Sequence, residues 1–282
     1  MADTLWFNGR WTTTDQPVLP VEDRGLQFGD AIYEVMKFLD RVPAFAREHY
    51  ERMNRGLGEL EIDHGWTWET FRDLLAELME RTAFADGIIY VQVTRGVAQR
   101  KHDAKPTEPV RIVYSRAFTF PDETKRRNGV AVVTRPDIRW GRRDLKTTNL
   151  LPNTLGKKEA IAAGADEAIF IDQGFVTEGS ISNFFAVEGE AVITHPSNEK
   201  ILPGVVRDRT IAVALEGKIR VDERPIKENE LFSLDEAFIT STTAGVMPVT
   251  SIDGRKVGSG TIGSMTQRLQ KDFLELERSQ TL

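Results

Sequence analysis

Two charged residues stand among small hydroxyl-bearing neighbours that could hold a polar ligand. Lys146 is followed by two threonines and an asparagine, and Glu178 lies in Thr-Glu-Gly-Ser. A neutral lysine amine can condense with a carbonyl group and move protons, and a buried carboxylate can hold a ring nitrogen protonated. Each segment alone is also typical of a solvated turn. Together they predict covalent chemistry on a carbonyl group attached to a nitrogen-containing ring.

The chain also offers positive charge before Lys146. Arg139, Arg142 and Arg143 lie just upstream, and neighbouring cations lower the pKa of a lysine amine toward its nucleophilic form. A basic surface loop has the same composition, so this observation favours a reactive lysine without deciding for it.

Two segments could bind a phosphate group. Gly204 precedes a predicted helix whose first backbone N–H groups could meet an anion, and the stretch 241–245 combines three hydroxyls with a glycine. Arg52, on an earlier predicted helix, could supply a fixed cation. A helix cap and a polar turn would explain the same residues. The Walker pattern is missing from the sequence, which disfavours an ordinary P-loop site.

A further pair could bind a carboxylate. In an extended segment, Arg100 and His102 point to the same side, and arginine binds carboxylates through two parallel hydrogen bonds. A solvated basic loop is the alternative. The other histidines, His49, His64 and His195, show no metal-ligand spacing, so we expect no metal site. A Gly-x-Ser-x-Gly elbow is also missing from the sequence, which disfavours a serine hydrolase.

Composition excludes several classes of protein. The 282 residues carry a formal charge of −6 and no cysteine, which argues against a general nucleic-acid binder and excludes disulfides and cysteine-based metal sites. The N-terminal segment lacks a basic region followed by an apolar core, and no apolar run approaches the roughly 20 residues that span a bilayer. We therefore expect a soluble, cytoplasmic protein with no nucleic-acid or membrane partner.

The pattern of apolar residues predicts an α+β protein with two domains. Helices are expected at 46–60, 68–82, 152–163, 204–215 and 261–276. Strands are expected at 31–39, 88–93, 110–114, 130–133, 167–171, 175–177, 181–187, 190–194 and 236–240, after a hairpin around Asn8-Gly9. We predict a small N-terminal α/β domain at 1–118, a linker at 119–123 and a large C-terminal domain at 124–282.

These segments, in this order, resemble the fold type IV pyridoxal phosphate enzymes (class IV aminotransferases), and most closely the bacterial D-amino acid transaminases. The matching stretches run nearly from end to end. They are 22–30, 33–35, 91–96, 137–140, 146–151, 177–183, 194–196 and 240–243.

The resemblance implies a pyridoxal 5′-phosphate cofactor in the cleft between the two domains. Lys146 matches the catalytic lysine that forms the Schiff base, and Glu178 matches the acid that pairs with the pyridine nitrogen. The remaining cofactor-binding positions match Arg52, Leu202, Val205, Val206, Ser241 and Thr242. Tyr33, Arg100 and His102 match the trap for the substrate carboxylate. In the family, the arginine and histidine come from the partner subunit, which implies a homodimer.

One residue departs from the family pattern. Val206 stands where many relatives carry a threonine whose hydroxyl binds the phosphate, so one hydrogen bond of about 1 kcal/mol would be lost. We expect weaker cofactor retention than in those relatives.

The expected activity is transfer of an amino group from a D-amino acid, such as D-alanine or D-glutamate, to a 2-oxo acid in a ping-pong cycle. The alternatives on the same fold are a branched-chain L-amino acid transaminase, an (R)-selective amine transaminase and a 4-amino-4-deoxychorismate lyase. A non-catalytic amino-acid-binding protein is disfavoured because Lys146 and Glu178 are both present. The sequence leaves open the preferred D-amino acid, oligomers larger than a dimer and the pathway.

Overall fold

The computed structural model describes residues 3–16, 19–103 and 108–282. The chain divides into two compact units, which are described separately. The first contains Met1–Thr119, Leu145–Asn149 and Glu277–Leu282, and the second contains Phe120–Asp144 and Leu150–Leu276. Lys146 therefore belongs to the first unit, although it lies after the linker expected at 119–123. That linker, as a boundary between independently folding domains, stays a prediction.

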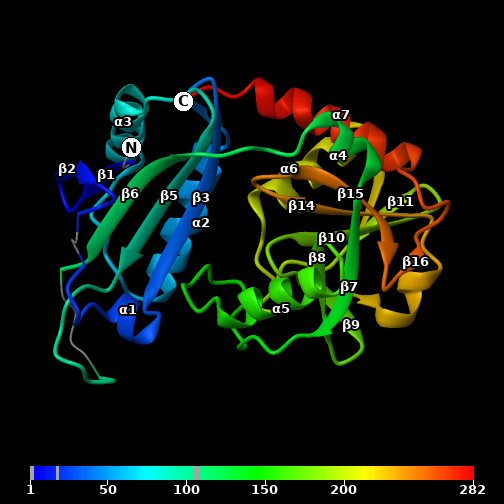
Figure 1. Ribbon diagram of the computed structural model, residues 1–282, viewed down its shortest axis with the longest axis horizontal. Coiled ribbons are helices and arrows are strands. Elements are labelled where there is room, and N and C mark those ends of the chain that lie inside the picture. The colour runs from blue at the N-terminus through cyan, green and yellow to red at the C-terminus, as the bar shows by residue number, and fades with distance from the viewer. Residues whose placement is uncertain (1–2, 17–18, 104–107) are drawn as a thin grey trace. The chain divides into compact units, whose positions relative to one another are not determined.

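The first unit is built on an antiparallel sheet that has six strands in the described part of the chain, in the order β2-β1-β6-β5-β3-β4 (Figure 1). Its strands are β1 (Thr4–Phe7), β2 (Arg10–Thr13), β3 (Ala31–Leu39), β4 (Val42–Pro43), β5 (Gly87–Thr94) and β6 (Val110–Ala117). The expected hairpin is confirmed, because Asn8 and Gly9 both adopt positive φ between β1 and β2.

Helices α2 (Ala46–Glu59) and α3 (Trp68–Arg81) pack against this sheet. Alternate strand residues such as Met36 and Val91 join an apolar core with Leu57 and Leu75 of the helices. Thr67 caps α3 reciprocally with Thr70, which explains where that helix begins. A short helix, α1 (Arg24–Phe28), precedes β3 and was not predicted.

The second unit is built on a mixed sheet that has ten strands among the described residues. Its strands are β7 (Val130–Pro136), β8 (Glu167–Asp172), β9 (Phe175–Gly179), β10 (Asn183–Glu188), β11 (Ala191–Thr194), β12 (Arg220–Glu223), β13 (Ile226–Lys227), β14 (Glu236–Ser241), β15 (Gly245–Ile252) and β16 (Arg255–Lys256). The order is β12-β11-β10-β14-β15-β7-β8-β9-β13, with β16 beside β15. The pairs β11·β12, β7·β15 and β7·β8 are parallel. This mixture is typical of an α+β unit.

The helices of the second unit are α4 (Glu123–Asn128), α5 (Leu151–Ala162), α6 (Val205–Glu216), a 3₁₀ turn η1 (Glu228–Phe232) and most of α7 (Ser264–Arg278). Helix α5 packs on β7 and β8, and α6 packs on β12, β14 and β15. The last residues of α7 belong to the first unit, where Glu277 forms a buried ion pair with Lys37 of β3.

The expected helices are confirmed to within one or two residues at most ends, but several predictions were wrong. Helix α7 begins at Ser264 instead of 261, because the Glu236 carboxylate accepts the N–H groups of Met265 and Thr266 and caps the helix there. Strand β10 begins at Asn183 instead of 181, and strand β15 was missed. Glu123, the last residue of the predicted linker, is also the first residue of α4, which Asp122 caps.

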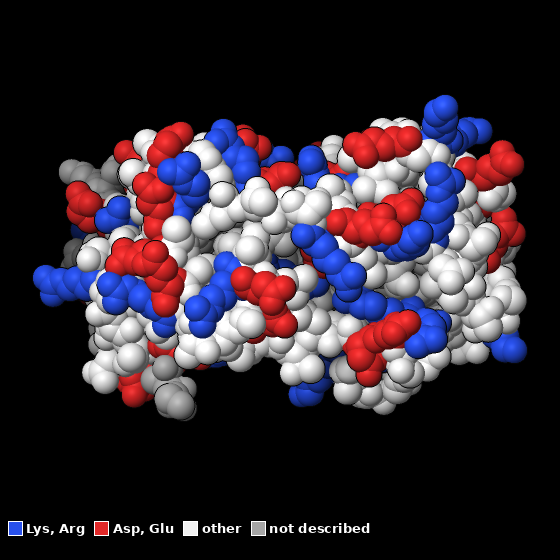
Figure 2. Space-filling view, turned by 90° about the horizontal axis from the view of Figure 1, so that it is seen from above, with Lys and Arg blue, Asp and Glu red and all other residues white. Residues whose placement is uncertain are grey.

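Basic and acidic side chains lie next to one another over the face that Figure 2 shows, as a modest net charge leads one to expect. Within the described residues, no helix is long and apolar enough to cross a membrane.

Candidate active site

Lys146 lies beside Tyr33 in the first unit. Its Nζ is 3.4 Å from the Tyr33 Oη and 4.4 Å from the centroid of the Tyr33 ring. Lys146 is half-buried, and among the described residues no carboxylate lies within ion-pair distance of its amine. The neighbour of the Lys146 amine is thus an aromatic hydroxyl and not a carboxylate, so no ion pair with a described residue holds this amine.

Three contacts fix the segment that carries Lys146. The Tyr33 N–H donates to the Lys146 carbonyl oxygen at 3.0 Å, and Thr147 forms an isolated β-bridge with Ile32. Gly29 ends α1 at a φ of 67°, and a Cβ there would lie 2.1 Å from the Asn149 Oδ1. A glycine is therefore required for both the turn and the close approach of Asn149.

Arg52, on α2, binds a buried carboxylate. Its Nε and Nη2 donate to Glu34 at 2.8 and 2.7 Å, and the His49 Nδ1 lies 2.8 Å from the same carboxylate. Burial by itself would raise the pKa of Glu34, but Arg52 and His49 outweigh it and hold that pKa below its usual range. Burial lowers the pKa of His49, against the attraction of Glu34. The guanidinium of Arg52 is thus rigidly oriented.

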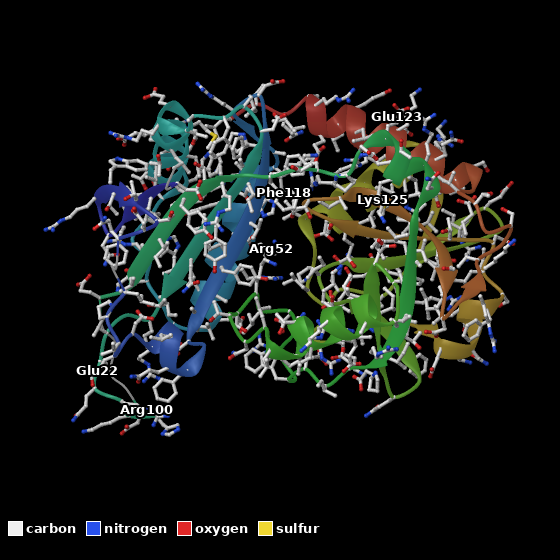
Figure 3. The ribbon with its side chains drawn as sticks, in the orientation of Figure 1. Glu22, Arg52, Arg100, Phe118, Glu123 and Lys125 are labelled. Carbon is white, nitrogen blue, oxygen red and sulfur yellow. The ribbon has the colours of Figure 1, made fainter. Side chains whose placement is uncertain are left out.

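Arg100 and His102 share one location, as their spacing predicted, but it is not at Tyr33. Both side chains are exposed and contact the ring of Phe28, at 5.0 Å for Arg100 and 5.4 Å between the rings for His102. Figure 3 shows Arg100 in the loop after β5, away from Arg52. Among the described residues, neither side chain contacts Tyr33, so one chain does not assemble the expected carboxylate trap.

Glu178, in β9 of the second unit, is a buried carboxylate with donors on both oxygens. The Leu202 N–H lies 3.0 and 3.1 Å from its two oxygens, and the Asn183 Nδ2 donates to Oε2 at 2.9 Å. The same Asn183 Nδ2 donates to the Leu202 carbonyl oxygen at 2.8 Å. Leu202, expected beside the cofactor ring, is thus fixed directly against Glu178.

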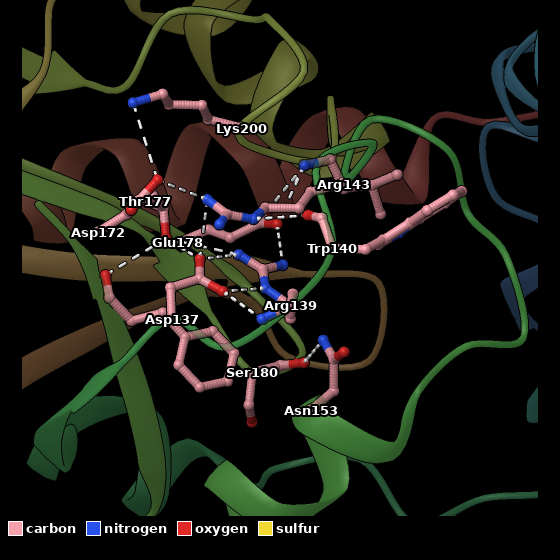
Figure 4. A network of polar contacts seen from close by, with 12 residues as sticks. Asp137, Arg139, Trp140, Arg143, Asn153, Asp172, Thr177, Glu178, Ser180 and Lys200 are labelled. Carbon is pink, nitrogen blue, oxygen red and sulfur yellow. Dashed lines mark hydrogen bonds and ion pairs between the residues drawn. The ribbon is translucent and has the colours of Figure 1, made fainter.

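The third donor to Glu178 is Arg139, whose Nη1 lies 2.5 Å from Oε1 (Figure 4). Arg139, Arg142 and Arg143, the three cations upstream of Lys146, each pair with acids of their own unit, and their effect on Lys146 stays a prediction. Arg142 binds Asp144, and Arg143 binds Asp172 and lies 3.2 Å from Asp137.

The charge state of Glu178 follows from two opposing effects. Burial raises the pKa of Glu178 above its ordinary value, whereas the charge and hydrogen bond of Arg139 lower it. The net direction is upward, so the positive charge of Arg139 offsets only part of the effect of burial on this carboxylate.

The N-terminus of α6 lies close to Glu178. Gly204 is the N-cap, no side chain of the described residues caps the helix, and Val205 and Val206 form its first buried positions. A Cβ on Gly204 would lie 2.1 Å from the Asn183 Oδ1, so the helix start abuts the residue that holds Glu178. Uncapped N–H groups at a helix start are suited to an anion.

The turn after β14 belongs to the same region. Asn183 pairs with Thr240 across β10 and β14, so their side chains share one face of the sheet. Ser241 and Thr242 follow directly, and the Ser241 Oγ accepts the Ala244 N–H at 3.3 Å. The structure therefore brings Glu178, Leu202, the start of α6 and the 241–242 turn into one neighbourhood within the second unit.

Residues 31–252 match the family described as amino-transferase class IV. The chain belongs to the class IV aminotransferases. It is 39% identical over 267 residues to a D-alanine aminotransferase of Bacillus licheniformis, covering 94% of this chain and 93% of that one. A D-alanine aminotransferase of Staphylococcus epidermidis is 36% identical over 280 residues, covering 99% of each.

Solved structures confirm the fold of this aminotransferase. The branched-chain amino acid aminotransferase of Escherichia coli matches with a TM-score of 0.91 at 24% identity, covering 100% of this chain and 97% of that one. The T.th. enzyme of the same name, solved with pyridoxamine 5′-phosphate, matches with a TM-score of 0.89 at 25% identity, covering 99% and 96%. The expected fold type IV and α+β class are therefore confirmed, and the chain is a pyridoxal phosphate-dependent aminotransferase.

The residues of this aminotransferase fit such a cofactor. Two buried hydroxyls beside Asn183, the Ser182 Oγ and the Thr240 Oγ1, have no hydrogen-bond partner among the described residues. Buried polar atoms are rarely left unpaired unless a ligand or water meets them. The described residues contain no cluster of acidic and histidine side chains that could hold a metal ion.

Sequence reasoning missed several residues of this site. Arg139 was noted only as an upstream cation, and its partner Asp137 was not singled out. Gly29, which admits Asn149, was also given no individual role. Two patterns could have indicated these residues. Gly29-Asp30 directly precedes a predicted strand, and Asp137 lies two residues before Arg139.

Proposed function

We propose that the chain transfers the amino group of a D-amino acid, such as D-alanine or D-glutamate, to a 2-oxo acid such as 2-oxoglutarate. The observation that carries this proposal is the similarity over nearly the whole chain to enzymes named D-alanine aminotransferase. Lys146 beside Tyr33 and the buried Glu178 supply the groups that such a reaction needs.

Bound pyridoxal phosphate supplies an aldehyde that condenses with amines and a ring that accepts the electron pair left when an α-proton departs. The residues of this chain bind and orient the cofactor and the substrate and move the proton. We assign to Lys146 the role of holding the cofactor, and its Nζ would accept and return the α-proton of the substrate. The Tyr33 Oη, 3.4 Å away, orients this amine.

Glu178 is assigned to the ring nitrogen, as a carboxylate that keeps the nitrogen protonated. Leu202, fixed by its N–H to Glu178, is assigned to one face of the ring. The phosphate is assigned to the Val205 and Val206 N–H groups, Ser241, Thr242 and Arg52, because a helix start and a fixed guanidinium favour a dianion.

The substrate carboxylate is assigned to Tyr33 together with Arg100 and His102 of a partner subunit. Arg100 and His102 are exposed and do not contact Tyr33 of their own chain, which is what a role in another copy requires. Exposed apolar side chains support a homodimer: Leu26 and Val97 near that loop, and Leu151, Leu155 and Ile161 on α5.

Subunit mixing tests this arrangement. Arg100→Ala and Lys146→Ala homodimers should each be inactive, whereas a heterodimer would contain one site with both residues intact. Co-refolding equal amounts should then restore about a quarter of the wild-type activity, since half of the dimers are mixed and each has one working site. Activity that never exceeds the sum of the two variants would contradict the partner's role.

The proposal places the enzyme in the cytoplasm and requires no nucleic acid or membrane. The chain has no cysteine and so no disulfide that needs an oxidising compartment.

The competing activities are branched-chain L-amino acid transamination and (R)-amine transamination. The first is favoured by the fold match to branched-chain enzymes, but those matches share only 24% and 25% identity with the chain. Steady-state assays with 2-oxoglutarate and D-alanine, L-leucine or an (R)-amine test the proposal. We expect the largest kcat/KM with D-alanine; a larger value with L-leucine or the amine would overturn it.

A further inference from the structure

Glu178 ends a row of buried and half-buried charges of alternating sign. Arg139 binds Glu178, Asp137 binds Arg139, and Arg143 lies between Asp137 and Asp172 (Figure 4). Lys200 lies 3.7 Å from Asp172 at the more exposed end of the row. Figure 4 shows the side chains pointing toward one another from separate strands and loops.

The guanidinium of Arg139 is fixed on several sides. Its Nε and Nη2 donate to the two oxygens of Asp137 at 3.0 and 2.7 Å, and its own backbone N–H donates to Asp137 at 3.1 Å. The Phe170 ring lies 4.9 Å from its central carbon. Only Nη1 is directed at Glu178, so this bond has one defined geometry.

Asp137 is itself immobilised. Its side chain is fully buried, and the Thr177 hydroxyl donates to its Oδ2 at 2.8 Å. Thr177 directly precedes Glu178 in β9, so one strand supplies both the acid and a contact that holds the acid's cation in place.

We propose that Arg139, locked by Asp137, is the positioning residue that keeps Glu178 ionised and correctly aimed before any cofactor binds. The link from Glu178 to a ring nitrogen rests on the proposed function, whereas the electrostatic dependence of Glu178 on Arg139 does not. Leu202 and Asn183 donate only neutral N–H groups, which orient the carboxylate but bring no countercharge.

The consequence of removing this cation can be worked out. In Arg139→Gln, Glu178 would be buried beside Asp137 with no positive charge bound to it, and both effects favour its protonated form. An acid whose pKa in the folded protein lies above the unfolded value loses protons less readily when folded. The folded state is therefore progressively destabilised as the pH rises from about 4.3 to the raised pKa.

The experiment is a set of urea unfolding curves of the full chain without cofactor between pH 5 and 8. Relative to wild type, the unfolding equilibrium constant of Arg139→Gln should increase with pH, by up to about tenfold per pH unit while one proton is involved. The double variant Arg139→Gln/Glu178→Gln should lose this extra slope, because it removes the titrating group. Arg139→Lys, which keeps the charge, should retain most of the wild-type profile.

Arg142→Gln is the matched control, because it removes an arginine from the same loop that pairs with Asp144 rather than with Glu178. Its profile should run parallel to that of wild type. The inference is overturned if the Arg139→Gln profile is also parallel, if Glu178→Gln fails to remove its slope, or if the double variant does not fold.

A separate titration of the wild-type chain with pyridoxal phosphate distinguishes the two proposals. If pyridoxal phosphate does not bind, the proposed function is contradicted and the unfolding result still stands. If it binds but the unfolding profiles of wild type and Arg139→Gln are parallel, only the role of Arg139 is contradicted.

Discussion

The Lys146 Nζ lies 3.4 Å from the Tyr33 Oη and 4.4 Å from the centre of the Tyr33 ring. Since the Tyr33 N–H also donates to the Lys146 carbonyl oxygen, one residue of β3 fixes both the backbone and the amine of the lysine. The proposed catalytic base is thus held by a strand rather than by a free loop.

Tyr33→Phe should lower kcat/KM by about tenfold, because it removes the hydroxyl that lies 3.4 Å from the Lys146 Nζ and leaves the ring in place. Tyr114→Phe is the matched control, since Tyr114 lies in the same stack of rings, separated from Tyr33 by Tyr90. The measurement is steady-state kinetics with D-alanine. A Tyr33→Phe enzyme within twofold of the control would show that the hydroxyl has no role.

The buried His49 should make stability depend on pH. Burial lowers its pKa in the folded protein, so between that pKa and about 6.5 the unfolded chain binds more protons. The free energy of unfolding should therefore decrease as the pH falls below about 6.5, and His49→Gln should lose part of this decrease. Glu34, whose pKa is lowered, affects stability only at more acidic pH.

Urea unfolding of the wild type and of His49→Gln at pH 7.5 and 5.5 measures this change in the free energy of unfolding. His64 and His195 also have pKa values lowered by burial, but they are present in both proteins and cancel in the comparison. An identical change in the two proteins would exclude His49 as a source.

Gly204→Ala should weaken cofactor binding by displacing a neighbour rather than by straining the backbone. Its φ of −71° suits alanine, but the added Cβ would lie 2.1 Å from the Asn183 Oδ1. Asn183 would have to shift and loosen its bond to Glu178, so we expect a loss of about tenfold in affinity. Gly141→Ala, where a Cβ meets nothing within 4 Å, is the control.

Fluorescence titration with pyridoxal phosphate gives the dissociation constants. Adding Gly204→Ala to Asn183→Ala should cost little, because the clash is gone. Fully additive losses would mean that Gly204 acts in some other way.

Val206→Thr should tighten cofactor binding by about fivefold, corresponding to about 1 kcal/mol for one neutral hydrogen bond. Val206 is in the first turn of α6, where the proposal places the phosphate. The same titration measures the effect. Equal dissociation constants for the two proteins would remove the basis for expecting weak retention.

The local parts of the site could be predicted from the sequence, because their signals lie within a few residues. Helix α3 follows from its cap and its apolar spacing, and Lys146 and Glu178 stand out by their neighbours. The contact of Arg139 with Glu178 spans 39 positions, and no local pattern distinguishes it from a solvated arginine.

Other features depend on packing between segments distant in sequence. The need for a glycine at position 29 becomes clear only when Asn149 is placed against it. Strand β15 was missed because Gly245 and Pro248 interrupt its pattern, whereas its pairing with β14 and β7 stabilises it in the folded sheet.

The most direct test of the central claim is a single half-reaction. The enzyme loaded with pyridoxal phosphate is mixed separately with D-alanine and with L-leucine, and the visible absorption of the cofactor is followed in a stopped-flow instrument. The account predicts rapid conversion to pyridoxamine phosphate with D-alanine and little change with L-leucine on that timescale. Rapid conversion with L-leucine and none with D-alanine would contradict it.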